Sequence, residues 1–422
     1  MKLVKMSLVA AMVMGASAFA IDNVKVDGDV KLYYITNDAG TNKLFNQGAF
    51  GTNNSSADTA LRLGVTGDLM KGVSFGLTGY AVSTLGLENN LVSNTWTNAH
   101  GATLGNGAQF AHGAGGAQVN DAAWIGEAWL AATLGKTTAK LGRMSLDTPL
   151  AFSETWSVVP NTFEAAVIIN QDLPDTTLVG AWVGKGNGTS AVNPSYASGL
   201  GVGIDNIMAS GATMNTFMNS GAYAAAVVNN SFKPLTAQAW YYNVVNVADA
   251  FWLQADINCQ LVKDLKIGAQ YADMSPKGLL NGVKDSKAYA VKLGYEGVKN
   301  LKVSGAYSAT DKNGVLSIAN VATANATAQS KLYTEAYWNY GYVGAPDAKS
   351  YNVTAEYNAG IAQLGAYYTN VNNTNNAADL KEVALSASKD FGPLNATAAY
   401  INTKPGTASS NNAVLAMLKL KF

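Results

Sequence analysis

Five polar residues on or beside segment 144–162 are the first candidates for chemistry in this chain. The segment is bracketed by the motifs Gly-Arg (142–143), Leu-Asp-Thr-Pro (146–149) and Pro-Asn-Thr-Phe-Glu (160–164). In a confined space of low dielectric constant, charges of this kind would act strongly on any nearby ion. The candidate residues are Arg143, Asp147, Glu154, Ser157 and Glu164.

Catalysis and metal binding have little support in the residue types. Hydrolysis needs a base, usually histidine, beside a nucleophile, and the chain has only His100 and His112, both in a Gly-rich segment. Their separation matches no short ligand motif, and Cys259 is distant in sequence. Acidic residues are scattered, with no pair singled out for glycoside chemistry. We therefore expect no enzyme, no cofactor and no metal site.

The elements that must position these residues read as β-strands. Polar and apolar side chains alternate in segments 24–34, 61–68, 253–260, 289–295, 351–357 and 414–422. A period of two puts one face of a strand in an apolar medium and the other in water. The pattern predicts an all-β fold in which one face of the sheet is apolar and the other is polar and hydrated.

The spacing of the connections predicts a transmembrane antiparallel β-barrel of about 18 strands. Beyond residue 20 no run of 18 apolar residues occurs, which excludes helical spans. Short turns are expected near 70–71, 135–136, 172–174, 233–234, 263–264, 299–300, 359–360 and 391–393, with mostly longer polar segments between them, notably 37–58, 85–121, 144–162, 184–221 and 310–348. Bacterial barrels have an even number of strands. Segment 331–342 would be a nineteenth strand, so we expect it to belong to the seventh loop instead. A sheet in hydrocarbon must close, because no edge can stay unpaired.

The amino terminus predicts export. Lys2 and Lys5 precede an apolar stretch, and Ala-Phe-Ala at 18–20 is a small-x-small cleavage site, so we expect 1–20 to be a secretory signal peptide. Without Lys2 and Lys5 the chain has 26 basic against 28 acidic residues, a balance that gives no reason to expect a nucleic-acid partner. The single cysteine excludes an intramolecular disulfide.

The two motifs around segment 144–162 are similar to those of the OprD family of porins. The resemblance covers about 23 residues and implies an 18-stranded channel whose third loop folds into the lumen, with basic wall residues that guide carboxylate-bearing solutes. Two features depart from the family. Ser157 stands where the family usually has arginine, and Arg62 and Arg143 are the only arginines here, so lysines must supply the wall charges without the bidentate grip of a guanidinium.

The alternation also predicts which wall charges face the lumen. A transverse field between them would orient solutes and bias the passage of ions, although wet lumen positions also tolerate polar residues that have no such role. The lumen candidates are Lys31, Arg62, Lys140, Asp256, Lys266, Lys292, Lys302 and Glu356.

These inferences combine into one hypothesis: residues 21–422 form a single barrel in the outer membrane of a Gram-negative bacterium. We expect a porin, a water-filled channel for passive diffusion of ions and small hydrophilic solutes. We expect its outer face to contact outer-membrane lipid. The sequence leaves both a monomer and a homo-oligomer as alternatives. The alternative is an abundant structural or adhesive surface barrel, which the long loops would also suit.

Overall fold

The computed structural model describes residues 21–40, 43–45, 56–83, 122–156, 158–187, 214–216, 221–322 and 328–422. The predicted signal peptide, His100, His112 and Ser157 lie outside these residues. Nearly all regular structure is strand: β1 (Asp22–Asn37), β2 (Ser56–Met70), β3 (Val73–Ser83), β4 (Ala122–Leu134), β5 (Thr137–Met144), β6 (Phe163–Asn170), β7 (Thr176–Gly186), β8 (Asn215–Thr216), β9 (Ala222–Asn229), β10 (Leu235–Val244), β11 (Ala248–Asn258), β12 (Leu265–Pro276), β13 (Ser286–Val298), β14 (Leu301–Thr310), β15 (Lys349–Asn358), β16 (Gln363–Asn372), β17 (Leu380–Phe391), β18 (Leu394–Pro405) and β19 (Asn411–Lys421).

Two short 3-10 helices complete the described elements, η3 (Gly278–Leu280) and η4 (Asn376–Ala378). Within the described ranges, no helix has the length and apolar character needed to cross a membrane.

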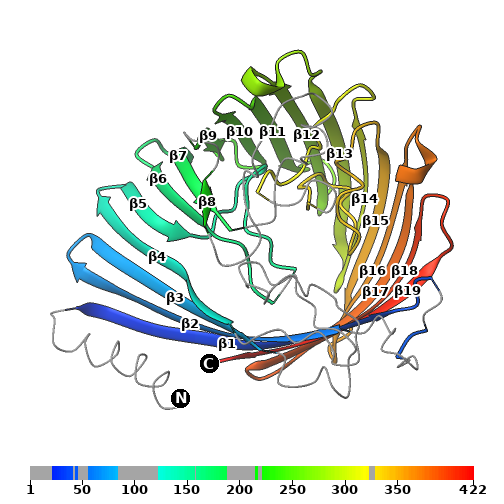
Figure 1. The fold of residues 1–422 in the computed structure, drawn as a ribbon, viewed down its shortest axis with the longest axis horizontal. Helices are drawn as coiled ribbons and strands as arrows, with labels where there is room; N and C mark the ends of the chain where they lie inside the picture. Colours follow the sequence, from blue (N-terminus) through cyan, green and yellow to red (C-terminus); the bar gives the residue numbers. More distant parts are fainter. Residues whose placement is uncertain are drawn as a thin grey trace.

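The strands form a closed antiparallel ring. β1 pairs with β2 on one side and with β19 on the other, and β7 pairs directly with β9. The two-residue β8 pairs only with the last two residues of β7, beyond the part of β7 that pairs with β9, so 18 strands make the barrel. Figure 1 shows this ring around an interior crossed by loops. Closure gives every neighbouring strand a hydrogen-bonding partner, which is the physical requirement that predicted a barrel; the predicted fold is confirmed.

The connections differ between the two ends of the barrel. All eight predicted short turns join neighbouring strands, and two of them contain Asp264 and Asn300 at φ 63°, a left-handed backbone that Asp and Asn tolerate. At the other end lie loop 3 (145–162) and loop 7 (311–348), although β10 and β11 are joined there by 245–247 alone. Segment 331–342 contains no strand and belongs to loop 7, as parity required.

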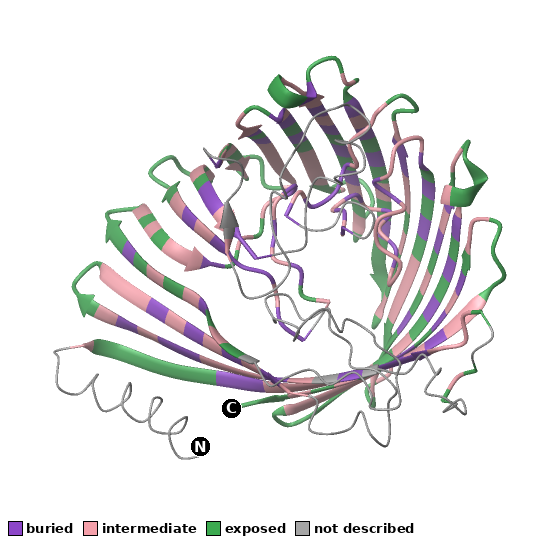
Figure 2. Ribbon diagram, viewed as in Figure 1, coloured by how far each residue is buried: buried purple, intermediate pink, exposed green. Residues whose placement is uncertain are grey.

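The two faces of the sheet have different chemistry. Along β13 the side chains of Tyr289, Val291 and Leu293 are exposed on the outer face, while Ala288 and Ala290 are buried inside. Figure 2 shows the alternating bands of buried and exposed residues along the strands. An apolar, exposed outer face is the one that hydrocarbon would cover.

Loops 3 and 7 fold into the ring and pack against its inner wall (Figure 1). Leu150 of loop 3 and Ile318 and Leu332 of loop 7 share one buried cluster with Trp252 of the wall. Val159 of loop 3 belongs to a second cluster with wall residues of β1, β3 and β18. Parts of the inner wall are therefore apolar, because loops and not water cover them.

Candidate functional site

Loop 3 is shaped by a tight turn at its first motif. The Thr148 hydroxyl donates to the carbonyl of Ala151 at 2.6 Å and accepts from the Ala151 amide at 3.2 Å. Asp147 and Phe152 form an isolated bridge across this turn. Proline at position 149 fixes its own φ and removes one donor, which suits a turn. The Leu-Asp-Thr-Pro motif thus places Asp147 in the bridge at the base of a small turn.

Asp147 remains the exposed acidic residue of loop 3. Its carboxylate is ion-paired with the ammonium group of Lys331 in loop 7, and 86% of its side chain is exposed. The Lys331 ammonium also lies 4.7 Å from the centre of the Phe152 ring. This pair joins the two loops at a point where solvent reaches the carboxylate.

Glu154 has the opposite environment, at 1% relative exposure. Its carboxylate accepts hydrogen bonds from the Trp156 indole at 2.7 Å, the Asn320 amide at 3.0 Å and the backbone of Gln329 at 3.1 Å. Asn161 of the second motif accepts from the Glu154 backbone amide at 2.7 Å. Glu154 therefore fastens loop 3 to loop 7, since Asn320 and Gln329 both belong to loop 7.

Arg143 and Glu164 tie together the two strand ends that carry loop 3. The guanidinium lies 2.9 Å from the Glu164 carboxylate, and Lys185 of β7 approaches the same carboxylate at 3.4 Å. Their strand neighbours Met144 and Phe163 are buried inside the barrel against Ala322 of loop 7. Because side chains alternate along a strand, Arg143 and Glu164 lie on the opposite, outer face of the wall.

Four of the predicted lumen residues come together in one cavity of about 480 Å³ between loop 7 and the inner wall. Three lysines come from β12, β13 and β14, and the fourth residue is a glutamate on β15. Tyr333 of loop 7 also lines the cavity, and its hydroxyl donates to Asp256 at 2.6 Å, which brings a fifth candidate to its border. The four are Lys266, Lys292, Lys302 and Glu356.

The remaining candidates lie on other parts of the wall. Arg62 is ion-paired with Asp27 at 2.5 Å and lies 3.7 Å from Asp29. Lys31 is opposite Lys419 in the β1–β19 ladder, so both belong to the same charged patch. Lys140 lies 4.0 Å from the centre of the Trp129 ring. The structure thus separates these charges into a lysine cavity, a patch where Arg62, Lys31 and Lys419 lie near Asp27 and Asp29, and Lys140 against an aromatic ring.

Two further acidic residues accept hydrogen bonds from the backbone of loop 7. Glu382 of β17 is buried and accepts from the backbone amides of Trp338 at 3.0 Å and Asn339 at 2.8 Å. Glu335 of loop 7 accepts from the backbone amides of Ser330 and Ala336. Glu335 lines the cavity and is half-buried. Burial raises the pKa of Glu335 to about 8, and the nearby carboxylates of Glu382 and Glu154 add to the rise.

No local signal in the sequence indicated the raised pKa of Glu335, because the nearby carboxylates of Glu154 and Glu382 come from segments far away in the chain. In the part of the chain that the structure describes, no group of three or more His, Cys, Asp or Glu could hold a metal ion.

A closed ring of 18 antiparallel strands, apolar outside and charged inside, is the architecture of outer-membrane porins. Solved structures of such porins from Pseudomonas aeruginosa have the same fold. OccK9 (OpdG) superposes with a TM-score of 0.71 at 13% identity, and 95% of this chain and 98% of that chain are covered. For OccK8 (OprE) the TM-score is 0.69 at 15% identity, again with 95% and 98% covered. For OpdK, solved with vanillate, the TM-score is 0.67 at 12% identity with the same coverage.

These solved structures are porins of the OprD family, so the family resemblance of the loop 3 motifs is confirmed at the level of the fold. No family profile and no curated protein matches the sequence.

Proposed function

We propose that this protein is an outer-membrane porin that lets ions and small hydrophilic solutes diffuse passively through a water-filled lumen. The observation that carries the proposal is the closed 18-stranded ring with a charged cavity on its inner wall. A barrel of this size is wide enough to enclose an aqueous passage. The proposed location is the outer membrane of a Gram-negative bacterium, with lipid against the apolar outer face; a homo-oligomer remains compatible with that face.

We further propose that loops 3 and 7 together form the constriction. Support comes from the contacts that hold both loops inside the ring, the Asp147–Lys331 ion pair and the hydrogen bonds of Glu154. Asp147 would act on passing ions directly. Glu154, Arg143 and Glu164 would position the loop. The role of Ser157 stays a prediction, because it lies outside the described residues.

A planar lipid bilayer tests the proposed function. Mature protein refolded in detergent, with folding verified by heat-modifiable gel mobility, should produce discrete conductance steps. The same protein boiled before addition is the control and should produce none. Correctly folded protein that produces no conductance steps in the bilayer would refute the porin assignment.

A further inference from the structure

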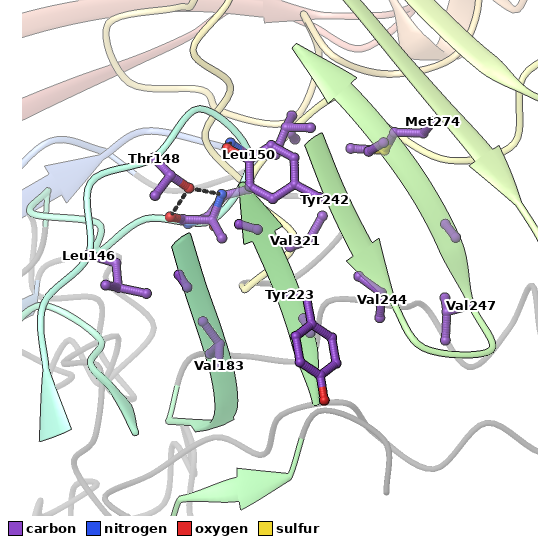
Figure 3. Close-up of a pocket in the computed structure, with 18 of the residues that line it drawn as sticks. Leu146, Thr148, Leu150, Val183, Tyr223, Tyr242, Val244, Val247, Met274 and Val321 are labelled. Atoms are coloured by element: carbon purple, nitrogen blue, oxygen red, sulfur yellow. Dashed lines mark hydrogen bonds between the residues drawn. The ribbon is translucent and has the colours of Figure 1, made fainter. Parts of the chain in front are cut away.

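A second cavity lies behind loop 3, away from the lysines. Its volume is about 110 Å³, and it is lined by loop 3, loop 7 and the inner wall of β6, β7 and β9–β12. Figure 3 shows Leu146 and Leu150 of loop 3, Val321 of loop 7 and the wall residues Val183 and Met274 gathered around it. The lining is almost entirely aliphatic or aromatic.

Three of the polar side chains beside this cavity, those of Thr148, Tyr242 and Asn320, already have hydrogen-bond partners. The Thr148 hydroxyl donates to Ala151, and the Tyr242 hydroxyl accepts from the Leu150 amide at 3.4 Å. The side-chain amide of Asn320 bonds to the backbone of Phe152 through both of its polar atoms. A water molecule in a cavity needs two to four polar partners, and one in this cavity would find few. The chemistry of the lining therefore favours an apolar occupant over water.

We infer that this cavity is a binding site for a small uncharged apolar molecule about the size of one six-membered ring. Engineered apolar protein cavities of about 150 Å³ stay dry and bind benzene or xenon, and this cavity approaches that size. The site goes beyond the proposed channel function, since it is lined by none of the charged wall residues and does not require conduction.

A molecule bound at this site would stabilise the packing of loops 3 and 7 against the wall. Leu146 and Leu150 line the cavity from loop 3, and Leu316 and Val321 line it from loop 7. An occupant would contact both loops and the wall together. A ligand that binds only the packed arrangement stabilises it in proportion to the logarithm of its concentration.

Two neighbouring alanines of β9 give a matched test. Ala224 lines the cavity, whereas Ala225 is exposed on the outer face of the same strand. The thermal unfolding midpoint is measured for the wild type, Ala224→Leu and Ala225→Leu at increasing benzene concentration in identical lipid nanodiscs. In wild type and Ala225→Leu the midpoint should rise with the logarithm of the benzene concentration. Ala224→Leu should need at least about tenfold more benzene for the same rise, because the added side chain fills the space.

Equal benzene dependence in all three proteins would overturn the inference, since the effect would then come from the lipid. A second measurement needs no variant: wild-type crystals pressurised with xenon should show a xenon atom between Leu150 and Val183. Crystals without xenon there would equally overturn the inference, and neither result depends on whether the protein conducts.

Discussion

Asp147 and Glu154 are seven residues apart in loop 3, yet the protein places them in opposite environments. Asp147 has 86% of its side chain exposed, whereas Glu154 has a relative exposure of 1%. A carboxylate that solvent reaches acts on ions in the passage, while a buried carboxylate saturated by donors acts on the protein around it. We therefore expect substitution of Asp147 to change ion selectivity, and substitution of Glu154 to change the stability of the loop packing.

Neutralising Asp147 should shift ion selectivity. Asp147→Asn removes one exposed negative charge and leaves Lys331 without its ion-pair partner, so the reversal potential under a salt gradient should move toward anion preference, with folding unchanged. Asp264→Asn is the control, because Asp264 lies in the short turn between β11 and β12 at a left-handed φ that Asn also tolerates. An identical reversal potential for wild type and Asp147→Asn would remove Asp147 from the constriction.

Glu335 should make the channel respond to pH. Its ordinary pKa of 4.5 is raised to about 8 in the folded protein, so the packed state favours the protonated form. The stability that the proton supplies is complete below about pH 4.5 and is lost as pH rises through about 8. Ionisation also adds a negative charge beside the lysine cavity, where the other charged groups are three lysines and two glutamates: Lys266, Lys292, Lys302, Glu296 and Glu356.

Cation preference should therefore increase between pH 7 and 9 in the wild type. Reversal potentials across this interval measure it, and Glu335→Gln should flatten the curve because the amide does not titrate. A curve of the same slope in Glu335→Gln would assign the titration to another group.

At the scale of elements, the contact between loops 3 and 7 depends on Glu154. Glu154→Ala leaves the Trp156 indole, the Asn320 amide and the Gln329 backbone without this acceptor in a buried place. The loss of a buried partner should destabilise the loop packing by about 1–3 kcal/mol. The expected readouts are a lower unfolding midpoint and noisier single-channel currents.

Glu154→Gln is the conservative companion, because its amide oxygen still accepts while the charge is gone. It should fall between wild type and Glu154→Ala in unfolding midpoint. Steady currents and an unchanged midpoint in Glu154→Ala would show that other contacts suffice to hold loop 3.

At the scale of the whole molecule, the barrel has an apolar outer face and a hydrated inner face. Val353 and Thr354 are neighbours near the middle of β15: Val353 is 56% exposed on the outer face and Thr354 lines the lysine cavity. A lysine in the middle of the lipid-facing surface costs about 2–4 kcal/mol. Val353→Lys should therefore lower stability in lipid by that amount, measured by denaturant titration in vesicles.

Thr354→Lys, one position along the chain, should fold with near wild-type stability and increase anion preference, because its ammonium group enters the wet cavity. Equal destabilisation by both substitutions would contradict the assignment of the two faces.

Much of this architecture could be predicted from local sequence. Strand faces follow from a period of two, so the alternation of Val291 with Lys292 already assigns one side chain to each face. Turn positions follow from residues such as Asn300, which tolerates a left-handed backbone. Each of these signals depends on residues close together in the chain, where steric and hydration effects act directly. The strand number followed from counting the turns, and closure followed from the cost of an unpaired edge in hydrocarbon.

The site itself depended on contacts that no local pattern encodes. Glu154 meets Gln329 at a separation of 175 residues, and the burial that raises the pKa of Glu335 is created by strands and loops from all over the chain. Arg143 and Glu164 share the charged character of lumen residues, but the buried neighbours Met144 and Phe163 put them on the outer face. Charge is a property of the residue, whereas burial, pairing and the direction of a field depend on which distant segments the closed ring brings together.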